Sequence, residues 1–189
     1  MLTTRFAPDI ALADGAATAA SAEQQLLTGD LTTLSVELLF DLRTAATGAL
    51  AVAVQEAMAG QLGLAEPIAL VDETGQPRLQ LLGYQLQPNA EKADVTVSLY
   101  FATVAPLDED YGIWFHTFVE GQEKRTFDHD PVLPTTRWPP GLIYRDQFTI
   151  SVPPGTYRLE TGLWHAESDR RLLPPTGDFG VTFGTVVVP

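Results

Sequence analysis

The sequence predicts an all-β protein whose strands form an antiparallel β-sandwich, immunoglobulin-like or jelly-roll-like. Short runs with apolar residues at alternate positions recur about every 8–12 residues, as they do in sandwiches. Turn residues, including 14 Pro and 15 Gly, separate these runs. No segment carries a convincing helical period. A closed barrel is the main alternative, because its strands follow the same pattern.

The first third of the chain is predicted to contain strands rather than helices. Residues 10–12 suit a short strand, and residues 16–27 suit a loop better than a helix. Residues 31–42 carry apolar side chains at alternate positions and are predicted to be a strand. Residues 49–57 are rich in Ala, which helices favour, but their larger apolar residues recur with period two. A second strand is therefore predicted there.

An internal similarity suggests how the chain is divided. Residues 34–61 can be laid over residues 95–122 without a gap, so that Val36, Leu38 and Phe40 fall on Val97, Leu99 and Phe101. We interpret this as a half-repeat, although two unrelated amphipathic strand pairs would also match in part. The predicted organisation is an N-terminal β half-repeat or partial sandwich over residues 1–65, which adds strands, and a complete β-sandwich domain over residues 66–189.

Strand signals are regular in the second part of the chain. Residues 111–119 are apolar on both faces, which predicts a central strand. Gly83 indicates a bulge, and Pro153-Pro154-Gly155 a tight turn. The residues expected to share one core are Val97, Leu99, Ile113, Phe115, Phe148, Tyr157 and Leu159. The predicted strands are residues 68–71, 79–86, 95–103, 111–119, 147–152, 157–164, 170–173 and 181–188.

Composition excludes several classes of function. The net charge of −13 argues against binding to nucleic acid or to an anionic membrane surface, because both would repel the chain. The absence of Cys excludes disulfides and thiolate chemistry. No apolar run reaches the roughly 18 residues of a membrane span. The first residues lack the pattern of a signal peptide, so we expect either an internal protein or a segment of a longer one.

Several short motifs follow one another between residues 110 and 172. They are DYxxxxH from Asp110 to His116, Asp128 before Pro131, PTxxW from Pro134 to Trp138, Pro140-Gly141, Asp146, PPGTYxL from Pro153 to Leu159, Gly162-Leu163-Trp164 and Arg171-Leu172. In this order they resemble the soluble β-sandwich tail of bacterial membrane glycosyltransferases of the protein-mannosyltransferase type, and related surface proteins. The resemblance covers residues 66–189, although the family has an acidic residue where this chain has Leu142. It implies a non-catalytic accessory domain outside the membrane.

Acidic residues and one histidine gather in residues 108–110 and 128–130. Their oxygen atoms would suit Ca²⁺, but calcium loops place ligands at alternate positions around a glycine-assisted bend, which is missing here. We interpret them as solvated loop acids and predict neither a metal nor a cofactor. His116 is interpreted as a hydrogen-bonded structural residue. No G-x-S-x-G elbow is present, so no enzyme is predicted, although carboxylate pairs that hydrolyse glycosides are defined by distance rather than by sequence.

The aromatic residues could form either a carbohydrate platform or the core of the sandwich. Trp138 stands in a proline-rich loop and is the strongest platform candidate, but we predict that it folds back and plugs the end of the sandwich. Structural arginine partners are expected for Asp128 and Asp146, namely Arg125, Arg137 or Arg145. The aromatic set comprises Tyr100, Trp114, Trp138, Tyr144 and Trp164, and the candidate ligand-binding residues are Trp138, Tyr144, Arg137, Asp128, His129 and Asp146.

These observations predict a non-catalytic β-sandwich module that acts outside the cytoplasm or on the cell surface. Its partner would be a carbohydrate, bound directly or as an accessory to glycan-handling enzymes. The alternative is a structural module that associates with itself or with another protein. Exposed aromatic residues beside polar side chains would favour the first hypothesis, and an exposed apolar edge on the half-repeat would favour the second.

Overall fold

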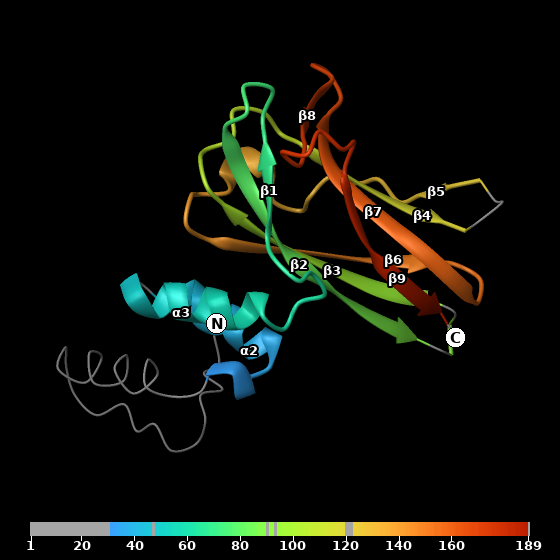
Figure 1. The fold of residues 1–189 in the computed structure, drawn as a ribbon, viewed down its shortest axis with the longest axis horizontal. Helices are drawn as coiled ribbons and strands as arrows, with labels where there is room; N and C mark the ends of the chain where they lie inside the picture. Colours follow the sequence, from blue (N-terminus) through green and yellow to red (C-terminus); the bar gives the residue numbers. More distant parts are fainter. Residues whose placement is uncertain (1–30, 47, 90, 93, 120–122, 189) are drawn as a thin grey trace. The chain divides into compact units, whose positions relative to one another are not determined.

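The computed structural model describes residues 31–46, 48–89, 91–92, 94–119 and 123–188 (Figure 1). The elements predicted at residues 10–12 and 16–27 lie outside this part of the chain. The chain separates into two compact units, Met1–Met58 and Ala59–Pro189. The sequence analysis predicted a division between residues 65 and 66, whereas the compact units divide between Met58 and Ala59.

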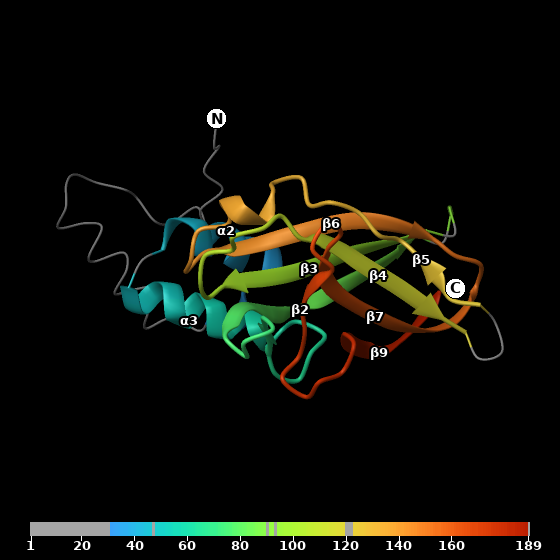
Figure 2. The same cartoon turned by 90° about the horizontal axis from the view of Figure 1, so that it is seen from above.

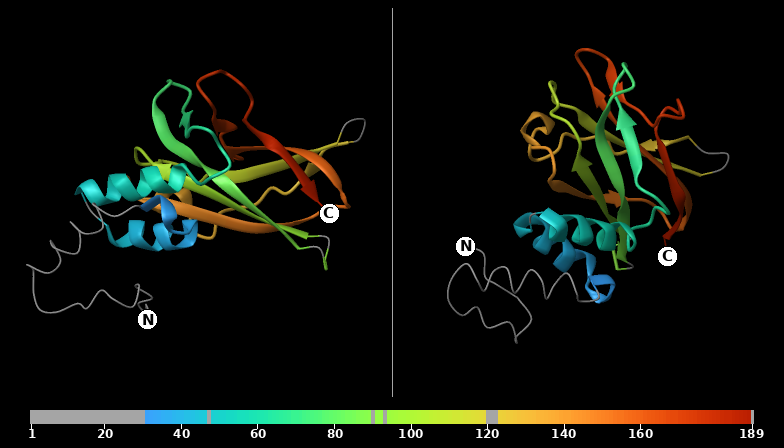
Figure 3. Two further views of the ribbon diagram at one scale, coloured as in Figure 1. Left: turned by 60° about the horizontal axis from the view of Figure 1, so that its bottom comes forward. Right: turned by 60° about the vertical axis from the view of Figure 1, so that its left-hand side comes forward.

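The first unit is helical where strands were predicted. A 3-10 turn η1 (Leu31–Thr33) precedes α2 (Val36–Ala45) and α3 (Gly48–Ala59), which Figure 3 draws in blue and cyan. The strands predicted at residues 31–42 and 49–57 are therefore wrong. The half-repeat is wrong over the same residues, because it aligned these helices with strands.

Local chemistry explains why the two helices form. Ser35 caps α2, since its hydroxyl accepts a hydrogen bond from the Leu38 N–H at 3.3 Å. Glu37 in the first turn and Arg43 in the last match the helix dipole. In α3 the Ala residues favour helix, and its buried side chains include a stripe with helical spacing at Leu50, Val54 and Met58. The apolar run of α3 fits period two as well, which is why the sequence misled.

The second unit is an antiparallel β-sandwich, and the predicted fold class is confirmed. Figure 2 shows its two sheets from above. One sheet has the order β1 (Ile68–Val71), β2 (Pro77–Asn89), β3 (Asp94–Thr103) and β6 (Ile143–Ser151). The other has the order β5 (Arg125–Thr126), β4 (Gly112–Phe118), β7 (Gly155–His165) and β8 (Arg170–Leu172), with β9 (Val181–Val188) also paired to β7.

Strand β7 organises the second sheet because it has three neighbours. β4 pairs along one edge of β7. On the other edge, β9 pairs with residues 155–161 and β8 with residues 163–165. The outward residues Gly112 and Trp114 of β4 consequently lie opposite Trp164 and Gly162 of β7. This register positions the candidate site described below.

The predicted core is confirmed. Residues from both sheets form one cluster, in which Phe115 is fully buried and meets Phe148 edge-on at 5.1 Å between ring centroids. Phe148 is only half-buried, and the other six predicted core residues are buried. In β4 every residue from Ile113 to Thr117 is buried, as expected of a strand covered on both faces.

Gly83 forms the predicted bulge in β2. The register with β3 shifts between Leu81 and Gly83. The φ of Gly83 is +149°, and a Cβ there would lie 2.5 Å from the Cβ of Leu62. A side chain at this position would therefore strain the backbone and collide with Leu62.

The two sheets are joined along both sides of the sandwich. On one side the backbone of Val71, in edge strand β1, exchanges two hydrogen bonds of 2.8 and 3.0 Å with Leu173, which follows β8. On the other side the imidazole of His129 contacts the carboxylate of Asp146 in edge strand β6. The described strands form two sheets rather than one continuous ring of paired strands, which the alternative of a closed barrel would require.

Candidate functional site

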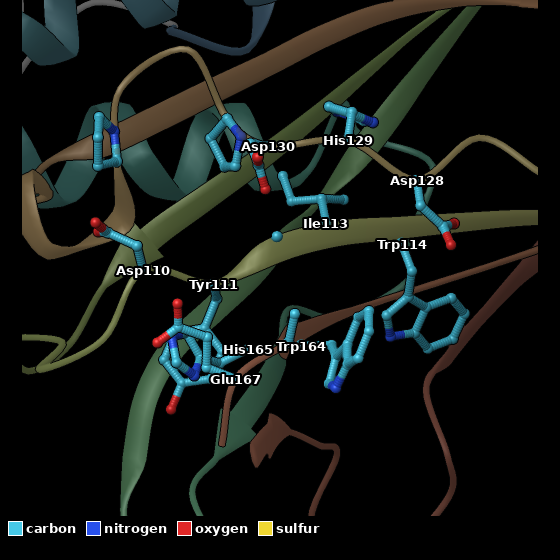
Figure 4. A pocket seen from close by; sticks show the side chains of 14 residues that line it. Asp110, Tyr111, Ile113, Trp114, Asp128, His129, Asp130, Trp164, His165 and Glu167 are labelled. Atoms are coloured by element: carbon cyan, nitrogen blue, oxygen red, sulfur yellow. The ribbon is translucent and has the colours of Figure 1, made fainter. Parts of the chain in front are cut away.

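A pocket of about 740 Å³ opens on the second sheet (Figure 4). Three segments form its walls: the start of β4, the end of β7 with the turn that follows it, and the strap, defined here as residues 127–134. The strap runs antiparallel to β4, because His129 and Ile113 exchange two backbone hydrogen bonds of 2.9 Å. The lining residues are Asp110 to Trp114, Asp128 to Pro131, Pro134 and Trp164 to Glu167.

Missing side chains shape the floor of this pocket. Gly112 lies under the strap, where an added Cβ would stand 3.1 Å from Oδ1 of Asp130. An added Cβ on Gly162 would stand 2.6–2.7 Å from three atoms of the Trp114 indole, so the ring face lies over this glycine. The two glycines therefore let Asp130 and Trp114 approach the sheet closely.

The two tryptophans at the pocket differ in exposure. Trp164 is 38% exposed, and its Nε1 donates to Asp169 at 3.1 Å. Trp114 is 5% exposed, and its Nε1 has no hydrogen-bond partner among the residues that the structure describes. Figure 4 shows the nitrogen-bearing edge of Trp114 turned toward Trp164. The pocket lining thus includes both the exposed indole of Trp164 and the indole of Trp114, whose N–H is buried.

Four carboxylates line the pocket, and two of them are held in place. Oδ1 of Asp110 accepts hydrogen bonds from the N–H and hydroxyl of Thr136, which lower the pKa of Asp110. Oδ1 of Asp128 accepts from the Phe115 N–H at 3.2 Å. The other two, Asp130 and Glu167, are exposed and make no ion pair or hydrogen bond with the described part of the chain. No Lys or Arg is among the lining residues.

His129 fastens the strap to the opposite sheet. Its Nδ1 lies 2.9 Å from the Phe127 carbonyl oxygen, and its Nε2 lies 2.9 Å from Oδ2 of Asp146. Both neighbours only accept hydrogen bonds, so the ring satisfies both when both nitrogens carry protons. The hydrogen bond to Asp146 is the main reason that the pKa of His129 is raised above its ordinary value.

His116 makes a looser pair with Asp128. The Nε2–Oδ1 distance is 3.4 Å, and the imidazole packs on Trp114 at 4.7 Å between ring centroids. Burial lowers the pKa of His116. The expected arginine partners were thus wrong in kind, because histidines contact Asp128 and Asp146.

The two acidic segments, residues 108–110 and 128–130, come together only in part. Asp110 joins the strap acids at the pocket, whereas Glu109 pairs with Arg170 at 3.3 Å. His165 accepts a hydrogen bond from the Ser168 N–H at its Nδ1, so the neutral ring carries its proton on Nε2. Within the described residues, no three His, Asp or Glu side chains are arranged to hold a metal ion.

The six candidate ligand residues are divided between two places. Asp128 and His129 line the pocket, and Asp146 supports His129 from β6. Trp138 is 3% exposed, donates from Nε1 to the Leu133 carbonyl at 2.8 Å and stacks on Tyr144 at 4.5 Å. The predicted plug is therefore confirmed, and Trp138 presents no platform. Tyr144 and Arg137 lie at this corner, outside the pocket lining.

Sequence reasoning named Trp164 in the wider aromatic set and Asp130 among the clustered acids, but the final candidate ligand-binding residues included neither of them, nor Glu167. The alternation of side chains along β4 places Gly112 and Trp114 on one face of the strand, and the sequence alone was enough to predict this. The pairing of β4 with β7, which sets Trp164 opposite Gly112, was the missing step.

Residues that carry the motif resemblance contact one another around the pocket. Thr135 accepts from the Tyr111 N–H at 2.8 Å, and Asp110 accepts from Thr136, so the first motif is fastened to PTxxW. The Tyr157 hydroxyl donates to the Pro153 carbonyl at 2.6 Å.

No protein-family model matches the chain. A comparison with curated proteins gives no match either. The function is therefore argued from the pocket. The structure describes no helix long and apolar enough to cross a membrane.

Proposed function

We propose that this protein is a non-catalytic carbohydrate-binding β-sandwich module that acts outside the cytoplasm beside glycan-handling enzymes. One observation carries the proposal: the exposed indole of Trp164 lines a pocket together with the carboxylates of Asp130 and Glu167, which have no partner among the described residues. A pyranose ring has an apolar C–H face and a rim of hydroxyl groups. An aromatic wall beside polar side chains is complementary to both.

The hydrogen-bonding capacity of the pocket supports a hydroxyl-rich ligand. Carboxylates only accept hydrogen bonds, and the indole N–H of Trp114 only donates. A hydroxyl group does both, so neighbouring hydroxyls of one sugar could serve the two kinds of group. The volume of about 740 Å³ is within the range of small-ligand pockets.

The pKa of one lining carboxyl group supports binding rather than hydrolysis. A general acid for glycoside cleavage needs a raised carboxyl pKa. The pKa of Asp110 is instead lowered by its hydrogen bonds to Thr136. His116 is buried with a lowered pKa.

The proposed extracytoplasmic role rests on the motif resemblance, which implies an accessory domain of membrane glycosyltransferases.

The proposal is tested by screening the protein on a glycan array and titrating the best oligosaccharide calorimetrically. We expect Trp164→Ala to weaken binding about tenfold or more, the scale of a lost aromatic stack, with little change in melting temperature. Val187→Ala is the control, because Val187 is 65% exposed and does not line the pocket.

Two outcomes contradict the proposal. One is that no glycan binds, and the other is that Trp164→Ala binds as tightly as the unchanged protein. Concentration-dependent association in sedimentation, together with no glycan binding, would favour the alternative function of a self-associating or protein-docking module.

A further inference from the structure

The charge of the pocket restricts which saccharide it can take. Asp110, Asp128, Asp130 and Glu167 line it without any Lys or Arg. A uronic acid or another anionic sugar would be repelled by this set, whereas a cationic group would be attracted.

Three basic side chains of this region either have acidic partners already or are held neutral by burial. Arg170 lies 3.3 Å from Glu73 and from Glu109, which are outside the pocket lining. His129 is bound to Asp146 of the opposite sheet. His116, beside Asp128, is buried and favours its neutral form. Asp130 and Glu167 line the pocket and make no ion pair with the described residues.

The buried indole N–H of Trp114 gives an independent indication of the ligand. Its edge is turned toward Trp164 at the pocket wall, and it has no acceptor in the part of the chain that the structure describes. A protonated amine cannot supply one, because an ammonium group has no lone pair. A sugar hydroxyl or ring oxygen can. A ligand that satisfies both the acids and this N–H carries an ammonium and oxygen acceptors together.

We propose that the pocket binds an amino sugar with a free, protonated amine, such as a glucosamine residue of an oligosaccharide. The inference rests on the proposed carbohydrate-binding function and names its ligand class. The ammonium binds Asp130, whose Oδ1 lies over Gly112, with Glu167 as the second carboxylate. The C–H face of the sugar stacks on Trp164, and one oxygen accepts from the Trp114 N–H, which is covered from solvent in the absence of a ligand.

The test compares three tetrasaccharides by calorimetry at low ionic strength: a glucosamine tetramer, its fully N-acetylated twin and a galacturonate tetramer. We expect the glucosamine tetramer to bind about tenfold tighter than its twin, and the galacturonate tetramer not to bind. The advantage of the free amine should shrink with added salt, because screening weakens exposed charge pairs. Asp130→Asn should remove most of this advantage, and Glu66→Gln, an exposed carboxylate outside the pocket, should keep it.

The outcomes separate this inference from the function beneath it. If none of the three sugars binds and the glycan array is also blank, the carbohydrate function fails. If the N-acetylated or galacturonate tetramer binds as tightly as the amine, or Asp130→Asn keeps the preference, the amino-sugar inference fails while the carbohydrate function stands.

A polyamine distinguishes binding of an amino sugar from binding of any molecule that carries ammonium groups. Spermidine carries ammonium groups but no oxygen acceptor, so it should bind weakly and should not respond to Trp114→Phe, which removes the indole N–H. The glucosamine tetramer should lose affinity with the same variant. Equal affinity for spermidine and the sugar would overturn the assignment of an amino sugar.

Discussion

Two histidine–aspartate pairs each include one residue of the strap, and the pKa values of their histidines are shifted in opposite directions. His129 meets Asp146 at 2.9 Å, and its pKa is raised. His116 meets Asp128 at 3.4 Å, and its pKa is lowered. The aspartate side chains also differ, since that of Asp146 is 8% exposed and that of Asp128 is 49% exposed.

The difference shows that a neighbouring carboxylate does not by itself fix the charge of a histidine. His129 has an acceptor at each ring nitrogen, the carbonyl of Phe127 and the carboxylate of Asp146. Its charged form is therefore fully hydrogen-bonded, and this outweighs the effect of partial burial. His116 is buried against the indole of Trp114, its aspartate is solvated, and desolvation prevails.

The largest expected effect comes from breaking the tighter pair. Asp146→Ala removes the carboxylate that joins the two sheets and leaves the half-buried His129 without one acceptor. We expect the free energy of unfolding to fall by about 2–3 kcal/mol, the scale of a hydrogen bond to a charged group. Urea unfolding near neutral pH measures it.

A matched control lies on the same strand. Thr149 is an exposed residue of β6, so Thr149→Ala should change stability by only about 0.5 kcal/mol. A loss for Asp146→Ala no greater than that of this control would show that the His129 contact does not hold the sheets together.

The second prediction concerns pH. Because the folded pKa of His129 is raised above 6.5, its stabilisation is fully present below that value and is lost as the pH rises through the folded pKa. The stability difference between the unchanged protein and Asp146→Ala should therefore shrink between about pH 6 and pH 9.

For His116, the dependence of stability on pH has the opposite sign. Its folded pKa lies below 6.5, so the unfolded chain binds protons more readily and stability falls as the pH drops below 6.5. His116→Gln should therefore reduce the acid sensitivity of the protein, measured as the change in melting temperature between about pH 7 and pH 5. An unchanged acid sensitivity in this variant would refute the assignment of His116 as a neutral residue.

The contrast between the pairs also shows what the sequence could predict. The strands of residues 66–189 were predictable because apolar alternation and turn residues agree there, as in β3 and at Pro153-Pro154-Gly155. The helices were not, because the Ala-rich run of α3 fits period two as well as period 3.6, and the capping role of Ser35 was overlooked. Asp128, His129 and Asp146 were recognised as candidates by residue type.

Their partners were not predictable, because they are set by distances across the sandwich. Asp146 lies in β6 of one sheet, and His129 lies in the strap of the other. Only the packing of the sheets decides that histidine, rather than arginine, reaches this carboxylate. The proline-rich loop of Trp138 suited a plug and a platform equally by sequence, and the structure buries the indole, whose N–H donates to the Leu133 carbonyl.

The third prediction breaks the looser pair. Asp128→Asn removes a mostly exposed charge but keeps an oxygen that can accept from the Phe115 N–H. We expect a loss of about 0.5–1 kcal/mol in the free energy of unfolding, well below that of Asp146→Ala. Equal losses for the two variants would show that the pairs contribute alike.

The smallest expected effect is a shift in one titration. Asp128 raises the pKa of His116 against the larger effect of burial, so Asp128→Asn should lower that pKa further. Asp128 is only the last of several influences that raise the pKa of His129, behind its hydrogen bond to Asp146. His129 should therefore titrate almost unchanged in the same variant. Proton NMR of the imidazole C–H signals follows both rings in one sample. A larger shift at His129 than at His116 would mean that Asp128 acts mainly on the strap, and that the two pairs form one coupled network.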